Sequence, residues 1–464
     1  MFSAKLIRQS YALAAIILTV ASVCPSKAAT VSDRPNIIYI MADDLGWGDL
    51  GCYGQKRIHT PNLDTMASEG MRFTQVYAGS TVCAPSRSVL MTGLHTGHTR
   101  VRGNARVPLL PEDVTVAEVL KQKDYRTALI GKWGLGEPET TGHPNQQGFD
   151  YFFGYLNQRH AHNYYPTHLW RNEKKVLLRN IVPNEDEVGG GVSDNKVDYS
   201  HDLMAEEALA YIRDNADHPF FLYLAFTIPH ANNEARNRGM EVPDMGDYSD
   251  LDWPEPQKGH GAMISRMDGD IGRIFALLEE LNIDDHTIVF FTSDNGPHRE
   301  GGNDPDYNDS NGPLQGIKRS MHDGGIRVPM IVRWPHQIRA GTVNDTAWYF
   351  ADFLPTAADL AGIDAPAALD GISIKPTLMG QTQDLSDRML YWEFHERGFK
   401  QAVRWGNWKG VRLGTKDPLQ LFHLTGDSGE QYNLAKQYPE VAAKLTRFLD
   451  HERTPSEHWP VKER

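Results

Sequence analysis

The sequence predicts an α/β fold, in which a large mixed, mostly parallel sheet is sandwiched by helices and is followed by a smaller C-terminal unit. Three observations lead to this prediction. Short, nearly continuous apolar runs, typical of strands buried on both faces of a parallel sheet, lie at 36–41, 219–226 and 286–292. Longer segments with helical character alternate with them, as at 200–215 and 262–282. Beyond residue 380 the pattern changes to short strands and turns.

The remaining elements continue this alternation. Before residue 380 we expect further helices at 62–70, 113–123 and 350–361, and further strands at 71–76 and 125–130. After residue 380 we expect strands at 388–394, 401–405, 408–413 and 419–423, and a final helix near 440–451. We therefore predict a main α/β domain over 29–380 and a C-terminal subdomain over 381–464.

Residues 1–28 have the pattern of a secretory signal peptide, in which basic residues precede an apolar run at 11–23 and small residues surround a cleavage site near Ala28. The run is too short for a confident membrane span. We therefore expect an exported protein, periplasmic or secreted, without a membrane span after cleavage. Lipid anchoring at Cys24 is disfavoured, because Val23 is a poor residue before a lipidated cysteine.

Charge and cysteine content exclude two classes of protein. The signal segment holds three of the 47 basic residues and none of the 60 acidic ones, so the remaining chain carries 44 against 60, a net charge of −16. Such a chain does not have the charge of a nucleic-acid-binding protein. Only Cys52 and Cys83 remain after cleavage, so no disulfide framework is expected in this exported protein.

The segment 81–93 is the most informative stretch of the chain. Cys83 opens a predicted helix in which Pro85 occupies the first turn, where a proline is tolerated. The free N–H groups of a helix N-terminus favour anions, and we expect them, with Arg87 one turn later, to lower the thiol pKa. The alternative interpretation is that Cys83 is a small buried apolar residue.

The residues Cys83-Ala84-Pro85-Ser86-Arg87, followed by Ser88 to Gly93, resemble the signature of the type I sulfatases of the alkaline phosphatase superfamily. Other blocks of that family recur in the same order along almost the whole chain. The resemblance implies that a formylglycine-generating or sulfatase-maturating enzyme converts Cys83 to formylglycine, whose hydrated aldehyde attacks sulfur. It also implies a small C-terminal antiparallel sheet covered by one helix.

Two pairs of polar residues follow predicted strands. Asp43 and Asp44 come after the run at 36–41, and Asp294 and Asn295 come after the run at 286–292. Open α/β sheets place ligands at the carboxyl ends of their strands. The resemblance assigns these four side chains to a divalent cation, and oxygen ligands suit Ca²⁺, with Mg²⁺ as the alternative. A two-zinc phosphatase needs a second set of Asp and His ligands, which the motifs do not supply.

Further catalytic residues are implied by the resemblance. It places Lys132 and Lys318 on the sulfate and His230 beside the ester oxygen of the leaving group. One position departs from the family pattern: Gly134 stands where the block Gly-Lys-Trp-His-Leu-Gly has its histidine. One catalytic role is therefore left without its usual residue.

The segment 158–166 is rich in imidazole and aromatic side chains. We expect His160 or His162 to supply the missing imidazole, because histidine titrates near neutral pH, and aromatic neighbours to shape a sugar subsite. Asn232 and Arg236 are further candidate substrate contacts.

The motifs together predict a sulfuric ester hydrolase that acts on a sulfated sugar or polysaccharide. Two alternatives remain open at this point. One is a phosphodiesterase or phosphonate monoester hydrolase of the same superfamily, and the other is a weakly active glycan-binding relative, suggested by Gly134.

Overall fold

The computed structural model describes Met1 and residues 34–462. The signal peptide predicted over 1–28 therefore lies, apart from Met1, outside the described residues. The described part contains an eleven-stranded sheet in the order β10-β2-β9-β8-β1-β7-β3-β4-β5-β6, with β11 paired to β2. Its central strands run parallel: β8 (Thr287–Ser293), β1 (Asn36–Ala42), β7 (Phe220–Ala225) and β3 (Arg126–Lys132). The predicted large, mostly parallel mixed sheet is confirmed.

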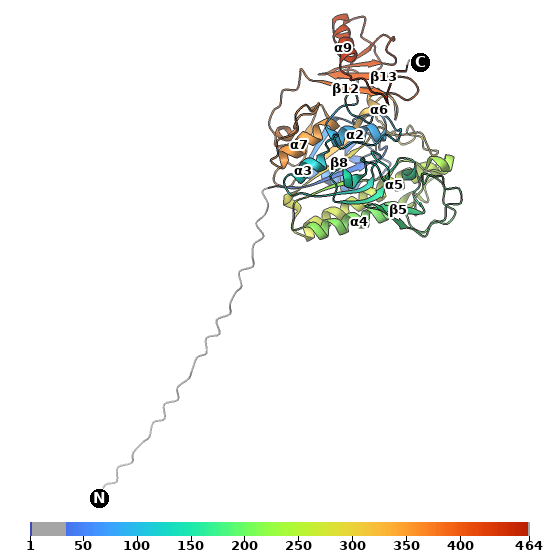
Figure 1. The fold of residues 1–464 in the computed structure, drawn as a ribbon, viewed down its shortest axis with the longest axis vertical. Coiled ribbons are helices and arrows are strands. Elements are labelled where there is room, and N and C mark those ends of the chain that lie inside the picture. The colour runs from blue at the N-terminus through green and yellow to red at the C-terminus, as the bar shows by residue number, and fades with distance from the viewer. Residues whose placement is uncertain (2–33, 463–464) are drawn as a thin grey trace. The chain divides into compact units, whose positions relative to one another are not determined.

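Alternation along β1 divides the core into two layers. Ile37, Tyr39 and Met41 belong to the apolar cluster on one face of the sheet, whereas Ile38 and Ile40 belong to the cluster on the other face. The helices that cover the first face are α2 (Cys83–Thr92), α3 (Val116–Lys121) and α7 (Phe353–Leu360). Those that cover the second are α1 (Pro61–Glu69), α4 (Ser200–Asn215) and α5 (Glu255–Glu280) (Figure 1).

Further strands, paired in both parallel and antiparallel directions, extend the sheet on both sides of these four central strands. These flanking strands are β2 (Met71–Tyr77), β9 (Arg327–Arg333), β10 (Thr342–Asn344), β11 (Trp348–Tyr349), β4 (Tyr151–Tyr155), β5 (His168–Arg171) and β6 (Lys174–Leu177). The pairs β8–β9, β2–β9, β4–β5 and β5–β6 are antiparallel. The short helices α6 (Asp323–Ile326) and α8 (Lys375–Leu378) lie in the connections.

Short 3-10 helices occupy many of the loops. Their bounds are η1 (Gly51–Tyr53), η2 (Pro144–Gln146), η3 (His160–His162), η4 (Asn233–Arg238), η5 (Gly246–Tyr248), η6 (Asp284–His286) and η7 (Phe350–Asp352). Two of them, η3 and η4, follow strand ends and bring polar side chains to the same region.

The C-terminal residues form the predicted antiparallel sheet with one helix. The four strands pair in sequence order and are β12 (Met389–Phe394), β13 (Lys400–Trp405), β14 (Trp408–Arg412) and β15 (Gln420–His423). Helix α9 (Pro439–His451) packs Leu445 and Leu449 against Tyr391 and Val403 of this sheet. The boundary between 29–380 and 381–464 stays a prediction.

The longest helix is the main difference from the predicted elements. Helix α5 begins at Glu255 instead of residue 262, so its first turns follow directly on a stretch rich in Pro and Asp, a composition typical of loops. Pro254 caps this helix and Pro256 lies in its first turn, where the missing N–H costs nothing. Among residues 34–462, no helix combines the length and the apolar composition needed to cross a membrane.

Candidate active site

The site lies where the parallel strands at the centre of the sheet end. Strand β1 lies between β7 and β8 and is aligned so that Ala42 faces Ser293. The residues that follow these two, Asp43 and Asp294, therefore emerge side by side, and both are fully buried. Lys132 is the last residue of β3, on the far side of β7. Strand order thus brings distant parts of the sequence to one place.

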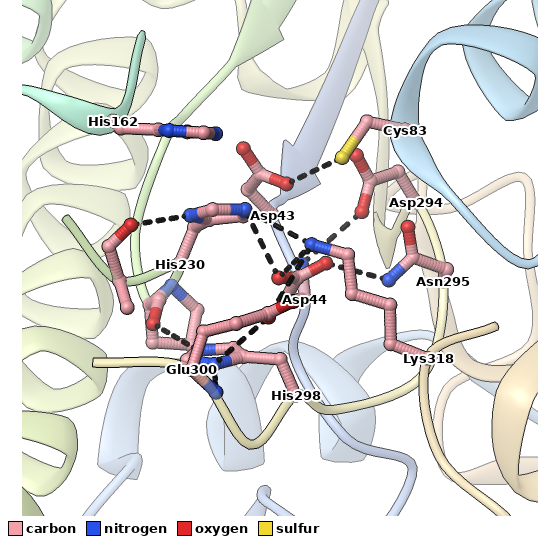
Figure 2. Close-up of polar contacts among 12 residues, drawn as sticks. Asp43, Asp44, Cys83, His162, His230, Asp294, Asn295, His298, Glu300 and Lys318 are labelled. Carbon is pink, nitrogen blue, oxygen red and sulfur yellow. Dashed lines mark hydrogen bonds and ion pairs between the residues drawn. The ribbon is translucent and has the colours of Figure 1, made fainter. Parts of the chain in front are cut away.

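Each of the three buried carboxylates has a cation beside it, and Figure 2 shows one of these pairs, Lys318 with Asp44. Lys132 Nζ lies 2.6 Å from Asp43 Oδ2, and Lys318 Nζ lies 2.6 Å from Asp44 Oδ2. The Arg87 guanidinium donates to Asp294 Oδ2 through Nη2 at 2.7 Å and Nε at 3.2 Å. Because charges are costly to bury unless they are paired, this arrangement indicates a site built for chemistry and not for packing.

The four predicted metal ligands converge. Asn295 Nδ2 donates to Asp44 Oδ1 at 2.6 Å, and the backbone N–H of Asp44 donates to Asp294 Oδ1 at 3.1 Å. Asn295 Oδ1 is buried without a hydrogen-bond partner. The pKa of Asp294 is raised, first by burial and then by the neighbouring Asp43 carboxylate. A donor set of carboxylates with one orphaned amide oxygen fits a hard divalent cation such as Ca²⁺ or Mg²⁺.

Cys83 begins α2 and points at the carboxylates. Its Sγ donates to Asp43 Oδ1 at 3.4 Å, and the N–H of Ala84 donates to Asn104 Oδ1 at 3.0 Å. The thiol pKa is raised well above its ordinary value, first by burial and then by Asp43, and Lys132 opposes this only in part. Our expectation of a lowered thiol pKa was wrong, because burial and the Asp43 carboxylate outweigh the nearby cations. As a cysteine, this residue is a neutral thiol and a weak nucleophile.

His230 is held in one tautomer beside Lys318. Its Nδ1 lies 2.7 Å from the Ala231 carbonyl oxygen and donates to it. Its Nε2 lies 2.9 Å from Lys318 Nζ and 3.3 Å from Asp44 Oδ2. Burial first, and then the nearby lysines, lower the pKa of His230 well below its ordinary value. The ring is therefore neutral, and its Nε2 accepts a hydrogen bond from Lys318.

The structure separates the two histidines of the segment 158–166. The His162 ring stacks on His230 with centroids 4.8 Å apart and planes inclined by 12° (Figure 2). The His160 ring is buried between Tyr155 and His168 instead, with centroids at 4.9 and 4.6 Å. Only His162 therefore joins the cluster around His230.

The other two candidate substrate contacts lie outside this cluster. Asn232 is fully buried and donates to Gly191 O at 3.1 Å and to Glu241 Oε2 at 2.8 Å. Its Oδ1 accepts the N–H of Glu234 and so caps η4. Arg236, within η4, is exposed to solvent.

Gly134 cannot be replaced by a larger residue without adjustment. Its φ is +86°, in the left-handed region, and a Cβ placed there would lie 1.9 Å from Gln158 Nε2. The amide of Gln158 thus occupies the space over this glycine. Both residues line a cavity of about 530 Å³, which Asn104 connects to the start of α2. The cavity wall also carries Arg106, Glu137 and Arg159.

Sequence reasoning missed three side chains of the cluster. His298 stacks on His230 at 5.5 Å, and Glu300 Oε2 lies 3.8 Å from Lys318 Nζ. Together with Asp44, these two place ligand atoms within 4.8 Å of one another. His298 lies three residues after Asn295, so its place near the end of β8 was a usable signal, whereas Glu300 begins a stretch rich in Gly and Asn, a composition typical of loops. The third, Glu234, contacts His162.

Comparison with known proteins identifies the family. The family model described as Sulfatase matches residues 35–363, and a model described as N-sulphoglucosamine sulphohydrolase, C-terminal, matches residues 317–454. The α/β fold and the buried ionic site thus belong to an enzyme that hydrolyses ester bonds. The chain belongs to the sulfatase family and is a sulfuric ester hydrolase.

Similar proteins match over almost their whole length. Human N-acetylgalactosamine-6-sulfatase is 30% identical over 91% of this chain and 86% of its own length. The N-acetylgalactosamine-6-O-sulfatase of Bacteroides thetaiotaomicron is 30% identical over 91% and 94%. Mouse steryl-sulfatase is also 30% identical, over 92% and 82%. The crystal structure of Ps i-CgsB in complex with k-i-k-neocarrahexaose has a TM-score of 0.77 and 27% identity, covering 90% of this chain and 92% of that one.

Proposed function

We propose that the protein hydrolyses sulfate monoesters of sulfated sugars. The observation that carries this proposal is the buried cluster in which Cys83, three cations and three carboxylates lie within contact distance of one another. Two of the similar proteins are sulfatases named for N-acetylgalactosamine, and one similar structure contains an oligosaccharide. Because another relative is a steryl-sulfatase, the family alone does not select the leaving group.

The cavity that Asn104 connects to the start of α2 carries polar groups that suit a sugar. Asn104, Arg106, Glu137, Gln158 and Arg159 stand in its walls beside the apolar side chains of Ala105, Val107, Pro108 and Val188. The hydroxyl groups of a sugar find donors and acceptors on the polar side chains, whereas a sterol offers few groups to pair with them. These polar side chains support a carbohydrate sulfate.

We infer that Cys83 acts after conversion to formylglycine by a separate maturation enzyme. The raised thiol pKa of Cys83 supports this, because an unmodified neutral thiol would attack poorly. In the hydrated aldehyde, one hydroxyl oxygen bonds to sulfur while the bond between sulfur and the ester oxygen breaks. Covalent catalysis then divides the hydrolysis into two easier steps.

The four oxygen-bearing side chains Asp43, Asp44, Asp294 and Asn295 would hold Ca²⁺ or Mg²⁺. When bound, such an ion neutralises charge on the sulfuryl oxygens. Lys132 and Lys318 add two further cations that face the same space. Arg87 donates to the Asp294 carboxylate and also to the Lys132 carbonyl oxygen at 2.7 Å. It therefore fixes the positions of Asp294 and of the end of β3.

Lys318 and His230 form a pair suited to the leaving oxygen. A neutral His230 can protonate an alkoxide only if it receives a proton, and Lys318 Nζ lies 2.9 Å from its Nε2. We propose that this pair supplies the proton as the sugar hydroxyl departs. Export of the protein by the signal at 1–28 would bring it to extracellular or periplasmic polysaccharide.

The decisive experiment combines mass spectrometry with sulfate release. Protein produced with a maturation enzyme is digested, the peptide containing Cys83 is weighed, and sulfate release is measured on a panel of sulfated oligosaccharides. Conversion of Cys83 with release that Cys83→Ala abolishes supports the proposal. Full conversion with turnover of phosphodiesters or phosphonate monoesters only would replace it, and saturable glycan binding without any turnover would indicate a binding protein.

A further inference from the structure

Three imidazoles stack in a column at the site, and they differ in their free ring nitrogens. His162, His230 and His298 follow one another with centroids 4.8 and 5.5 Å apart (Figure 2). Both nitrogens of His230 are engaged, by the Ala231 carbonyl and by Lys318. Both nitrogens of His298 are engaged as well, by the Pro229 carbonyl and by the N–H of Glu300.

His162 is the exception in this column. Its Nδ1 lies 3.2 Å from Glu234 Oε2, whereas its Nε2 has no hydrogen-bond partner within residues 34–462. The His162 side chain is 15% exposed to solvent, whereas the His230 side chain is 2% exposed and the His298 side chain is fully buried. His162 is thus the imidazole of the column that can exchange a proton with a bound molecule.

Glu234 is fixed from two further directions. Its Oε1 lies 3.2 Å from Arg159 Nη1, and its backbone N–H is capped by Asn232 Oδ1. Arg159 lies just before η3, the turn that carries His162, and is itself bonded to Asp186. The buried amide of Asn232 makes no hydrogen bond to His162 or His230, and it acts on them indirectly by placing Glu234.

The charges around His162 favour a neutral ring whose lone pair is on Nε2. Burial is the largest influence and lowers the pKa of His162, and the cations Lys132 and Lys318 lower it further. Glu234 raises the pKa and holds the proton on Nδ1. His230, stacked beneath, is itself neutral. A carboxylate-oriented neutral imidazole of this kind is a general base.

We propose that His162 is the general base of the sulfate-release step and that Glu234, anchored by Arg159, is its positioning residue. This inference rests on the proposed function. In that step the O–H bond of the free hydroxyl on the Cys83-derived group breaks and its proton goes to His162 Nε2. The oxygen electron pair forms the carbonyl bond, and the carbon–oxygen bond to sulfate breaks, so that sulfate leaves with that electron pair. No oxidant or reductant is needed.

The test uses fully converted enzyme and rapid-mixing kinetics on a sulfated sugar that the wild type hydrolyses. We expect His162→Ala to reduce kcat by roughly 10²- to 10⁴-fold, the usual contribution of a general base. Because the release step follows departure of the sugar, the variant should give a burst of desulfated sugar. Its intact mass should then show a stable sulfate adduct.

Glu234 is tested by the pH dependence of kcat. Glu234→Gln removes an influence that raises the pKa of His162, so the acidic limb of the kcat profile should move to lower pH while kcat falls. Glu234→Asp should recover part of the rate. Glu185→Gln is the matched control, because Glu185 lies 4.0 Å from His168, away from the column, and should change neither the limb nor the rate.

The outcomes are separable. A fall in kcat with an unmoved acidic limb and no burst would show that His162 and Glu234 are structural, and would overturn the inference. The same holds if His162→Ala keeps wild-type kcat. If converted wild-type enzyme releases no sulfate from any ester, the proposed function fails before the inference is reached.

Discussion

A buried ion pair attaches the C-terminal sheet to the main domain, and its removal should be costly. Lys409 on β14 has no exposed surface and lies 2.5 Å from Asp323 Oδ1 and 3.1 Å from Glu430 Oε1. In Lys409→Met both carboxylates stay buried without this cation, which typically costs about 3–5 kcal/mol. We therefore expect guanidinium titrations at pH 7 to give a free energy of unfolding that is lower than that of the wild type by this amount.

The pH dependence of this variant follows from Asp323. Burial raises the pKa of Asp323, but Lys409 and Arg327 outweigh burial and hold it at about 2. A carboxyl with a depressed pKa stabilises the native state above its unfolded pKa and loses that contribution as pH falls through the folded value. The difference between wild type and Lys409→Met should therefore shrink between about pH 4 and pH 2.

Two comparisons decide whether the reasoning holds. Lys375→Met is the matched control, because the Lys375–Asp359 pair is 36% and 42% exposed and should contribute no more than about 1 kcal/mol. Combining Lys409→Met with Asp323→Asn and Glu430→Gln should recover much of the lost stability, since no charge is then left unpaired. A cost below about 1 kcal/mol for Lys409→Met at pH 7 would refute the argument.

Three further predictions concern the site and its surroundings. Gly134→Ala should destabilise the protein by about 1–3 kcal/mol in guanidinium titrations, because its φ of +86° strains any other residue, while Gly269→Ala in α5 should not. Adding Ca²⁺ to chelator-treated protein should raise the melting temperature, because the ion binds only the native carboxylate cluster, and Asp294→Asn should remove this rise. Burial raises the pKa of Asp49 to about 7, so Asp49→Asn should gain stability over wild type between pH 4 and pH 8; an equal difference at both pH values would contradict this.

Local patterns were sufficient to predict the elements at the centre of the fold. The apolar run at 36–41 is buried along its whole length in β1, as a strand covered on both faces must be. The convergence of Asp43 with Asp294 could be anticipated, because both follow strands of a parallel sheet. Their role as metal ligands stays a prediction.

Properties that depend on distant contacts could not be predicted. The thiol pKa of Cys83 depends on burial and on a carboxylate 3.4 Å away, which only strand order brings there. His160 and His162 look equivalent in the sequence, yet one 3-10 turn directs them to different neighbours. Nothing local to Gly134 reveals that Gln158 covers it.

The C-terminal sheet also reaches the segment that carries Lys318. Arg319 Nε lies 3.2 Å from Glu396 Oε2, and Glu430 accepts the N–H of Asp323 at 2.5 Å. Residues that follow β12 thus anchor the segment that carries Lys318, the lysine that we propose faces the sulfate. Proteolytic cleavage or truncation in the last part of the chain should therefore abolish turnover while the large sheet remains folded. Loss of activity should thus precede loss of the main fold.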